Sequence, residues 1–233
     1  MKDNNHISNH TPENRSEARA YVYQWLAEKY TNPIDNKYAD FDTTALRDAL
    51  AYLELEEQLQ PEIRTLEKGL QERADSLETI VEFCRLFYGP HKVPAPPFGS
   101  YWLEEGTLLG ETTIAVKNTY NKWGLTLSPN AKTHPDHLSI ELEFMYYLAV
   151  KEEEAREAKD YSQACQFLIA QQEFLQNYLL LWVYPFTEKV TYSTEMELFV
   201  GLSKLTAAFL KADYYLINDL KISYQRHRHL RYQ

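Results

Sequence analysis

An aspartate and a histidine that stand side by side, Asp136 and His137, are the residues of this chain with the clearest chemical potential. A carboxylate next to an imidazole can exchange protons with a substrate, as general acid–base catalysis requires. The carboxylate can also hold an arginine side chain through two parallel hydrogen bonds. In a purely structural interpretation, the aspartate caps a helix and the histidine bonds to a backbone carbonyl. The two residues alone leave all three interpretations open.

The pair stands at the start of an expected helix over residues 136–159. Pro135 suits the first helical turn, and either Thr133 or Asp136 can supply the cap. Apolar residues then recur at three- and four-residue spacing, namely Leu138, Leu142, Met145 and Leu148. This spacing predicts one apolar stripe against a core, with Asp136 and His137 left at the mouth of the helix, where a groove could use them.

A proline-rich segment, residues 89–103, precedes that helix. Four of the ten prolines of the chain fall between Gly89 and Gly99, a density that no helix interior tolerates. Phe98 and Trp102 follow closely, whereas flexible linkers are polar or rich in glycine and serine. We therefore expect a rigid, packed loop that lines a surface groove, at a hinge between two possible lobes. A plain linker is the alternative.

The rest of the chain has the spacing of helices. Residues with this pattern are 13–30, 43–60, 62–71, 77–89, 107–123, 161–182 with a break at Pro185, and 194–220. Gly124 is expected as a left-handed cap, and the charged run 151–154 is typical of a solvated face. No stretch alternates with a period of two for long enough to predict a sheet. The expected fold class is all-α, a single helical globule of about ten helices over residues 13–220.

The two ends of the chain are expected to lie outside this globule. Residues 1–12 are polar and predicted to be disordered, and residues 221–233 form a basic tail. His227 and His229 in the tail are two positions apart and would not share a helix face, so a frayed basic end is expected there and no metal site. Cys84 and Cys165 lie far apart in helical patterns and are expected to be buried free thiols in a reducing compartment.

Composition restricts the partners. The chain has 233 residues and 34 acidic against 24 basic side chains, a net charge of −10 that repels nucleic acid. Such a surface favours encounter with a basic peptide, although the charge can also serve solubility alone. The first twenty residues contain no signal-peptide pattern, and the longest apolar run, residues 178–186, is too short to span a bilayer. A cytoplasmic location without membrane insertion is expected.

Two motifs resemble those of the TorD/DmsD family, cytoplasmic chaperones that assist the maturation of exported molybdenum enzymes. Residues 133–145 are similar to the family's P-x-D-H-x-x-x-E/L-x-x-M motif. Residues 94–103, PAPPFGSYWL, followed by LGETT at 109–113, resemble P-A-P-P-W-G-S-x-W-L and L/F-G-D/E-S/T. The order and spacing of the motifs match, and the helical pattern extends the resemblance over roughly residues 15–220.

The chain departs from the family pattern at three places. Phe98 replaces a common tryptophan, and the proline that often stands two residues before the aspartate is displaced to Pro135, with His134 in its place. The stretch 182–186, WVYPF, lacks the histidine of the family's H-x-x-P-W pattern. These differences leave the expected fold intact and put in doubt which client is recognised.

The resemblance implies a non-enzymatic chaperone that binds the twin-arginine signal peptide and the apo form of a molybdopterin-containing oxidoreductase, similar to DMSO or TMAO reductase, until its cofactor is inserted. It implies no catalytic residue, cofactor or metal in the chaperone itself, and a monomer or a domain-swapped homodimer. The expected signal-peptide-binding residues are Pro97, Phe98, Gly99, Trp102, Leu109, Gly110, Pro135, Asp136 and His137. Asp136 would clasp an arginine, and the apolar members would shelter the hydrophobic segment.

Two alternative functions remain at this level. One is an assembly chaperone for a nitrate-reductase-type complex, which would bind its client regardless of arginines. The other is a nucleotide-dependent factor or enzyme that uses Asp136 and His137 in chemistry. The chain contains no nucleophile elbow, Walker loop, Rossmann glycine pattern or H-E-x-x-H motif.

Overall fold

A computed structural model of the protein describes residues 14–31, 42–73, 77–89, 92–128, 131 and 133–230, except for the side chains of residues 73 and 227–230. Its helices are α1 (Arg15–Lys29), α2 (Thr44–Tyr52), α3 (Gln60–Arg73), α4 (Leu77–Phe87), α5 (Gly99–Leu103), α6 (Glu111–Lys122), α7 (Leu138–Glu157), α8 (Tyr161–Phe174), the π-helical segment η2 (Leu175–Leu179), α9 (Leu180–Ser193) and α10 (Glu197–Leu230). Within these ranges, extended pairing is limited to one bridge between Phe98 and His137. The prediction of an all-α fold is confirmed.

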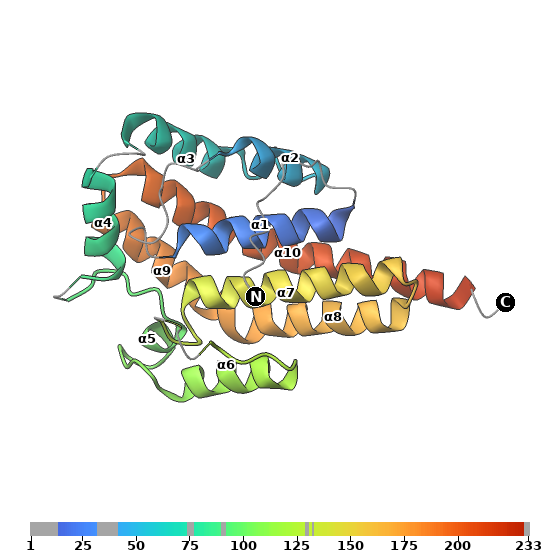
Figure 1. Ribbon diagram of the computed structural model, residues 1–233. Coiled ribbons are helices and arrows are strands. Elements are labelled where there is room, and N and C mark those ends of the chain that lie inside the picture. The colour runs from blue at the N-terminus through green and yellow to red at the C-terminus, as the bar shows by residue number, and fades with distance from the viewer. Residues whose placement is uncertain are drawn as a thin grey trace.

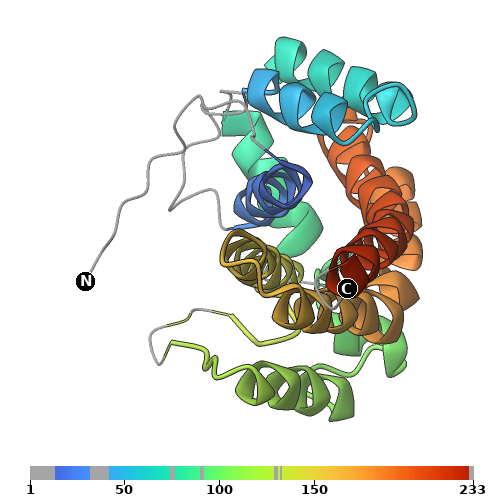
Figure 2. The ribbon, with the colours of Figure 1, turned by 90° about the vertical axis from the view of Figure 1, so that its right-hand side faces the viewer.

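The helices surround a core to which α1, α7, α8 and α10 all contribute. Helix α1 packs against α7, and the long α10 packs against α3, α8 and α9. Figure 1 shows the α2–α3 pair on one side of this assembly and α6 on the other, and Figure 2, turned by 90°, shows α10 lying away from α1 across the molecule. Large fully buried side chains fill the interior, among them Tyr23, Trp25, Tyr30, Phe83, Phe174, Trp182, Phe186, Phe199 and Phe209. Among the described residues, no helix is both long and apolar enough to cross a membrane.

Two glycines allow α3 and α10 to cross in direct backbone contact. A Cβ atom on Gly69 would lie 2.0 Å from the backbone nitrogen of Leu198, and one on Gly201 would lie 2.3 Å from that of Leu66. Real Cβ atoms do not approach backbone this closely, so any side chain at either position would push the helices apart. The close crossing therefore depends on both residues being glycine.

The expected helix over residues 43–60 is wrong in its second half. Helix α2 ends at Tyr52 because Glu54 adopts a left-handed conformation with φ of 61°. The amide of Leu55 then donates to the carbonyl of Leu50 at 2.8 Å, which is the hydrogen bond of a Schellman ending. A left-handed glutamate gives no warning in sequence, because glycine or asparagine usually occupies this position.

The expected break at Pro185 is also wrong, because Pro185 lies inside α9. Regular α-helical hydrogen bonding changes before Pro185, in the π-helical turn η2.

The last helix was expected to end at Leu220, yet α10 continues to Leu230. The side chains of His227 and His229 and the disorder predicted for residues 1–12 lie outside the described structure. The thiols of Cys84 and Cys165 are half-buried, less buried than expected.

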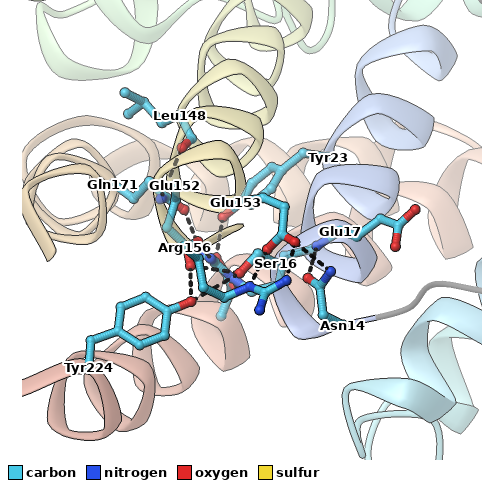
Figure 3. Close-up of polar contacts among 12 residues, drawn as sticks. Asn14, Ser16, Glu17, Tyr23, Leu148, Glu152, Glu153, Arg156, Gln171 and Tyr224 are labelled. Carbon is cyan, nitrogen blue, oxygen red and sulfur yellow. Dashed lines mark hydrogen bonds and ion pairs between the residues drawn. The ribbon is translucent and has the colours of Figure 1, made fainter. Parts of the chain in front are cut away.

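A buried polar network joins α1, α7, α8 and α10 (Figure 3). The guanidinium of Arg19, fully buried, donates to Asp213 at 2.5 and 2.9 Å and to Glu152 at 3.0 Å. Tyr23 donates to Asp213 and Tyr224 to Glu152, both at 2.6 Å. Burial opposes the charge of Arg19, but the two carboxylates more than offset it and hold its pKa above the usual range. The network fixes how four distant segments pack.

This network corrects the interpretation of the charged run 151–154 as a solvated face. Glu152 has no exposed surface, whereas Glu154 next to it is exposed. Burial raises the pKa of Glu152, and Arg19 offsets only part of that effect. The buried position follows from helical geometry, because Glu152 lies four residues after Leu148 on the core-facing side of α7.

Candidate functional site at the proline-rich segment and helix α7

The proline-rich segment folds directly onto the start of α7. The amide of Gly99 donates to the carbonyl of Asp136, and the amide of Leu138 donates to the carbonyl of Pro97, both at 2.9 Å. The extended backbone at Phe98 and His137 makes the single antiparallel bridge between the two segments. Consecutive prolines favour this extended form before Phe98, and Pro97, which has no N–H group, takes part through its carbonyl alone. The two motifs found in the sequence are therefore one structural unit.

His137 is the N-cap of α7, in place of the expected Thr133 or Asp136. Its Nδ1 accepts the backbone amide of Ser139 at 3.2 Å and lies 2.8 Å from the Ser139 hydroxyl. Since Nδ1 is an acceptor, Nε2 carries the proton and faces the hydroxyl of Tyr88 at 3.3 Å. Burial, with a smaller effect of His134, lowers the pKa of His137 to about 3. The imidazole is therefore neutral and structural at physiological pH.

Asp136 caps a different helix from the one expected. Its Oδ2 accepts the backbone amide of Ser100 at 2.9 Å, in the first turn of the short α5. Its Oδ1 is buried and has no hydrogen-bond partner among the described residues. Asp136 and His137 have no exposed surface at all. The expectation that the pair faces an open groove at the helix mouth is therefore wrong in this conformation, because the proline-rich segment covers both side chains.

Glu141 is a buried carboxyl group that the sequence reasoning missed. Its Oε2 accepts the indole N–H of Trp182 at 3.2 Å, and its Oε1 has no partner in the described part of the chain. Burial raises the pKa of Glu141 well above the usual range, and the negative charge of Asp136 raises it further. The signal was present in sequence, because Glu141 lies three residues after Leu138 on the same apolar stripe.

The remaining predicted residues divide between a packed loop and an exposed one. Pro97 and Gly99 are buried, and Phe98, Pro135 and Trp102 are half-buried. The indole of Trp102 donates to the carbonyl of Pro96 at 2.8 Å. Leu109 and Gly110 lie farther along, just before α6, and Leu109 is 58% exposed.

Exposed apolar side chains surround Leu109 in sequence. The exposed apolar stretch 103–114 carries Leu103, Leu108, Leu109 and Ile114, with exposures from 38% to 59%. The stretch is held by Glu104, whose carboxylate accepts the amide groups of Glu111 and Thr112 at the start of α6. Six of the nine predicted residues, Pro97, Phe98, Gly99, Pro135, Asp136 and His137, therefore belong to the paired segments. Trp102 packs against the same loop, and Leu109 and Gly110 belong to the exposed stretch.

Among the residues that the structure describes, no three histidine, cysteine or acidic side chains are grouped so that they could hold a metal ion. The candidate site consists of two helix-capping side chains, two buried carboxyl groups and the exposed apolar stretch 103–114.

Comparison with known proteins assigns the chain to a family. The model of a family described as nitrate reductase delta subunit matches residues 52–188, more than half of the chain. Chaperone protein TorD of Vibrio cholerae is 28% identical over 210 residues, which cover 88% of this chain and 94% of that protein. TorD of Vibrio parahaemolyticus is 28% identical over 204 residues, covering 85% and 94%. The chain belongs to the nitrate reductase delta subunit family and, within it, to the TorD/DmsD group of redox-enzyme maturation chaperones.

A crystal structure of a proposed redox enzyme maturation protein from Archaeoglobus fulgidus is also similar. It is 22% identical in sequence, the match covers 90% of this chain and 99% of that one, and the TM-score is 0.46.

Proposed function

We propose that this protein is a system-specific cytoplasmic chaperone that binds the twin-arginine signal peptide and the apo form of an exported molybdoenzyme. It holds this client until the cofactor is inserted. Support comes from the TorD relatives, which match along 94% of their length, and from the motif residues that pair the proline-rich segment with α7. Binding of the signal peptide would keep an immature enzyme from the export machinery.

The observation that carries this proposal is the exposed apolar stretch 103–114 beside the paired motifs. A signal peptide contains an apolar segment that needs shelter from water. Leu108, Leu109 and Ile114 expose about half of their side-chain surface or more, and they could bury it against such a segment. Burial of a single leucine contributes about 1.5–3 kcal/mol. A few such contacts would give micromolar affinity, about 8 kcal/mol, which suits a carrier that must release its cargo.

The buried pair Asp136 and His137 enters this proposal through the loop that covers it. An arginine could reach Oδ1 of Asp136 only after the proline-rich segment has moved away from α7. In that movement the guanidinium would replace the amide of Ser100 as the partner of the carboxylate. Binding of the peptide would thus expose the side chains of Asp136 and His137. The contact between Asp136 and arginine is a prediction.

Calorimetry with a synthetic peptide tests the proposal. The peptide carries two arginines followed by an apolar segment, and the wild type is compared with Leu109→Ser. We expect the wild type to bind with micromolar affinity and Leu109→Ser to bind about tenfold more weakly. Ile222→Ser is the matched control, because Ile222 is 49% exposed on α10. Absence of binding to the wild type, or equal weakening by both substitutions, would count against the proposal.

Assembly of a nitrate-reductase-type complex is a second candidate function, favoured by the description of the matching family. A client of this kind would be bound regardless of arginines. A peptide with glutamines in place of the arginines distinguishes the two functions. Equal affinity for both peptides, together with capture of a nitrate-reductase-type subunit from the host, would support the second function over the first.

The third candidate function, a nucleotide-dependent factor or enzyme, has less support from the structure than the two chaperone functions. General acid–base chemistry needs a group within hydrogen-bond reach of a substrate, and both Asp136 and His137 lie beneath the proline-rich segment. Retained client maturation in a His137→Asn variant would argue further against a catalytic role.

A further inference from the structure

A groove of about 540 Å³ lies on the face formed by α1, α6, α7 and residues 125–128 and 131. None of the nine binding residues predicted from the sequence lines it. Its walls are mainly aromatic and aliphatic, with Tyr120, Leu125, Leu127, Ile140, Phe144 and Tyr147 among the lining side chains. Ligand sites in proteins are typically clefts of about 300–1,000 Å³ with mainly apolar walls and a few polar groups, and this groove has that character.

Two carboxylate groups from distant parts of the chain also line this groove. Glu28 lies in the last turns of α1, and Glu143 lies in the second turn of α7. The surrounding protein raises the pKa of Glu143, and the negative charge of Glu28 raises it further. No lysine or arginine is among the described residues that line the groove. Two carboxylates on the walls of one groove make it complementary in charge to a basic side chain.

The groove adjoins the paired motifs. Tyr120 lines the groove, and its hydroxyl donates to the carbonyl of Pro135 at 2.9 Å, directly before Asp136. Ile140, another lining residue, stands in the first turn of α7. Burial raises the pKa of Tyr120 well above its usual range, and the charges of Glu141, Asp136 and Glu143 raise it further. A peptide in the groove would therefore lie next to the segment that covers Asp136.

We infer that this groove receives the arginine-bearing end of the client's signal peptide, with a guanidinium group held by Glu143 and Glu28 and the adjoining apolar residues packed on its walls. The inference rests on the proposed function and assigns the arginines a receptor other than Asp136. Arginine fits better than lysine, because its planar group can bond two carboxylates and stack on tyrosine rings at once.

Fluorescence anisotropy with three labelled peptides tests this inference. The peptides share one apolar segment and carry Arg-Arg, Lys-Lys or Gln-Gln before it. The proteins are the wild type, Glu143→Gln, Glu28→Gln and the double variant. Glu188→Gln is the control. Glu188 is exposed on α9, so its replacement removes one negative charge from a surface outside the groove. Circular dichroism and thermal melting establish that each variant is folded.

We expect Glu143→Gln to weaken binding of the Arg-Arg peptide about tenfold, the loss of one charge-assisted contact. The double variant should bind the Arg-Arg and Gln-Gln peptides equally, and Glu188→Gln should behave as the wild type does. If the wild type prefers Arg-Arg and all three groove variants keep that preference, the groove is not the receptor, although the proposed function stands. If the wild type binds all three peptides equally, the inference is also overturned. If it binds none, the proposed function itself fails.

Discussion

Replacement of Arg19 by methionine should destabilise the protein more than any single surface change. The side chain is fully buried and makes two hydrogen bonds to Asp213 and one to Glu152. Methionine fills a similar volume but leaves two buried carboxyl groups without their cation. Removal of one partner from a buried ionic network costs about 3–5 kcal/mol. For a domain of this size, that loss lowers the melting temperature by roughly 6–20 °C.

Urea denaturation followed by circular dichroism measures this loss, with Arg47→Met as the matched control. Arg47 also bonds two carboxylates, Glu67 and Glu56, but its side chain is 26% exposed, so we expect a loss of about 1 kcal/mol or less. A second variant, Arg19→Met combined with Asp213→Leu and Glu152→Met, should recover part of the stability. No buried charge remains unpaired in it, although the hydroxyl groups of Tyr23 and Tyr224 lose their acceptors. Equal losses for Arg19→Met and Arg47→Met would refute the reasoning.

Three further predictions concern the paired motifs and the helix crossing. Because burial lowers the folded pKa of His137 to about 3, below its unfolded value near 6.5, its contribution to stability is present above about pH 6.5 and is lost as the pH falls towards 3. His137→Asn should therefore show a shallower loss of stability over that range, by up to about 1.4 kcal/mol per pH unit, in urea titrations at stepped pH. Asp136→Ala should cost about 1 kcal/mol and speed hydrogen exchange at the Ser100 amide, whereas Asp136→Asn, which keeps an acceptor, should leave that amide protected. Gly201→Ala should cost about 1–3 kcal/mol by forcing a Cβ atom against the backbone of Leu66, and an unchanged unfolding midpoint would contradict the close crossing.

The helical class and the site segments could be predicted from the sequence because their signals are local. The apolar spacing from Leu138 to Leu148 gave α7 its buried face, and Gly124 adopts the expected left-handed conformation with φ of 75°. The proline-rich segment and the Asp136 motif were identified as a pair by their resemblance to one family. The predicted end of the helix over residues 43–60 was wrong because no sequence rule predicts a left-handed glutamate. The conformation of Glu54 depends on the packing around the end of α2.

The sequence by itself determined that this chain is an acidic, all-helical member of its chaperone family, because composition, periodicity and motif spacing are properties of neighbouring residues. Only the tertiary structure decided which charges are buried and which can meet a ligand. It covered Asp136 with the proline-rich segment, placed Glu152 beside Arg19, and brought Glu28 and Glu143 to one groove. The free energy of a charged side chain depends on burial and on partners from distant segments, and the packing of helices alone brings those partners together.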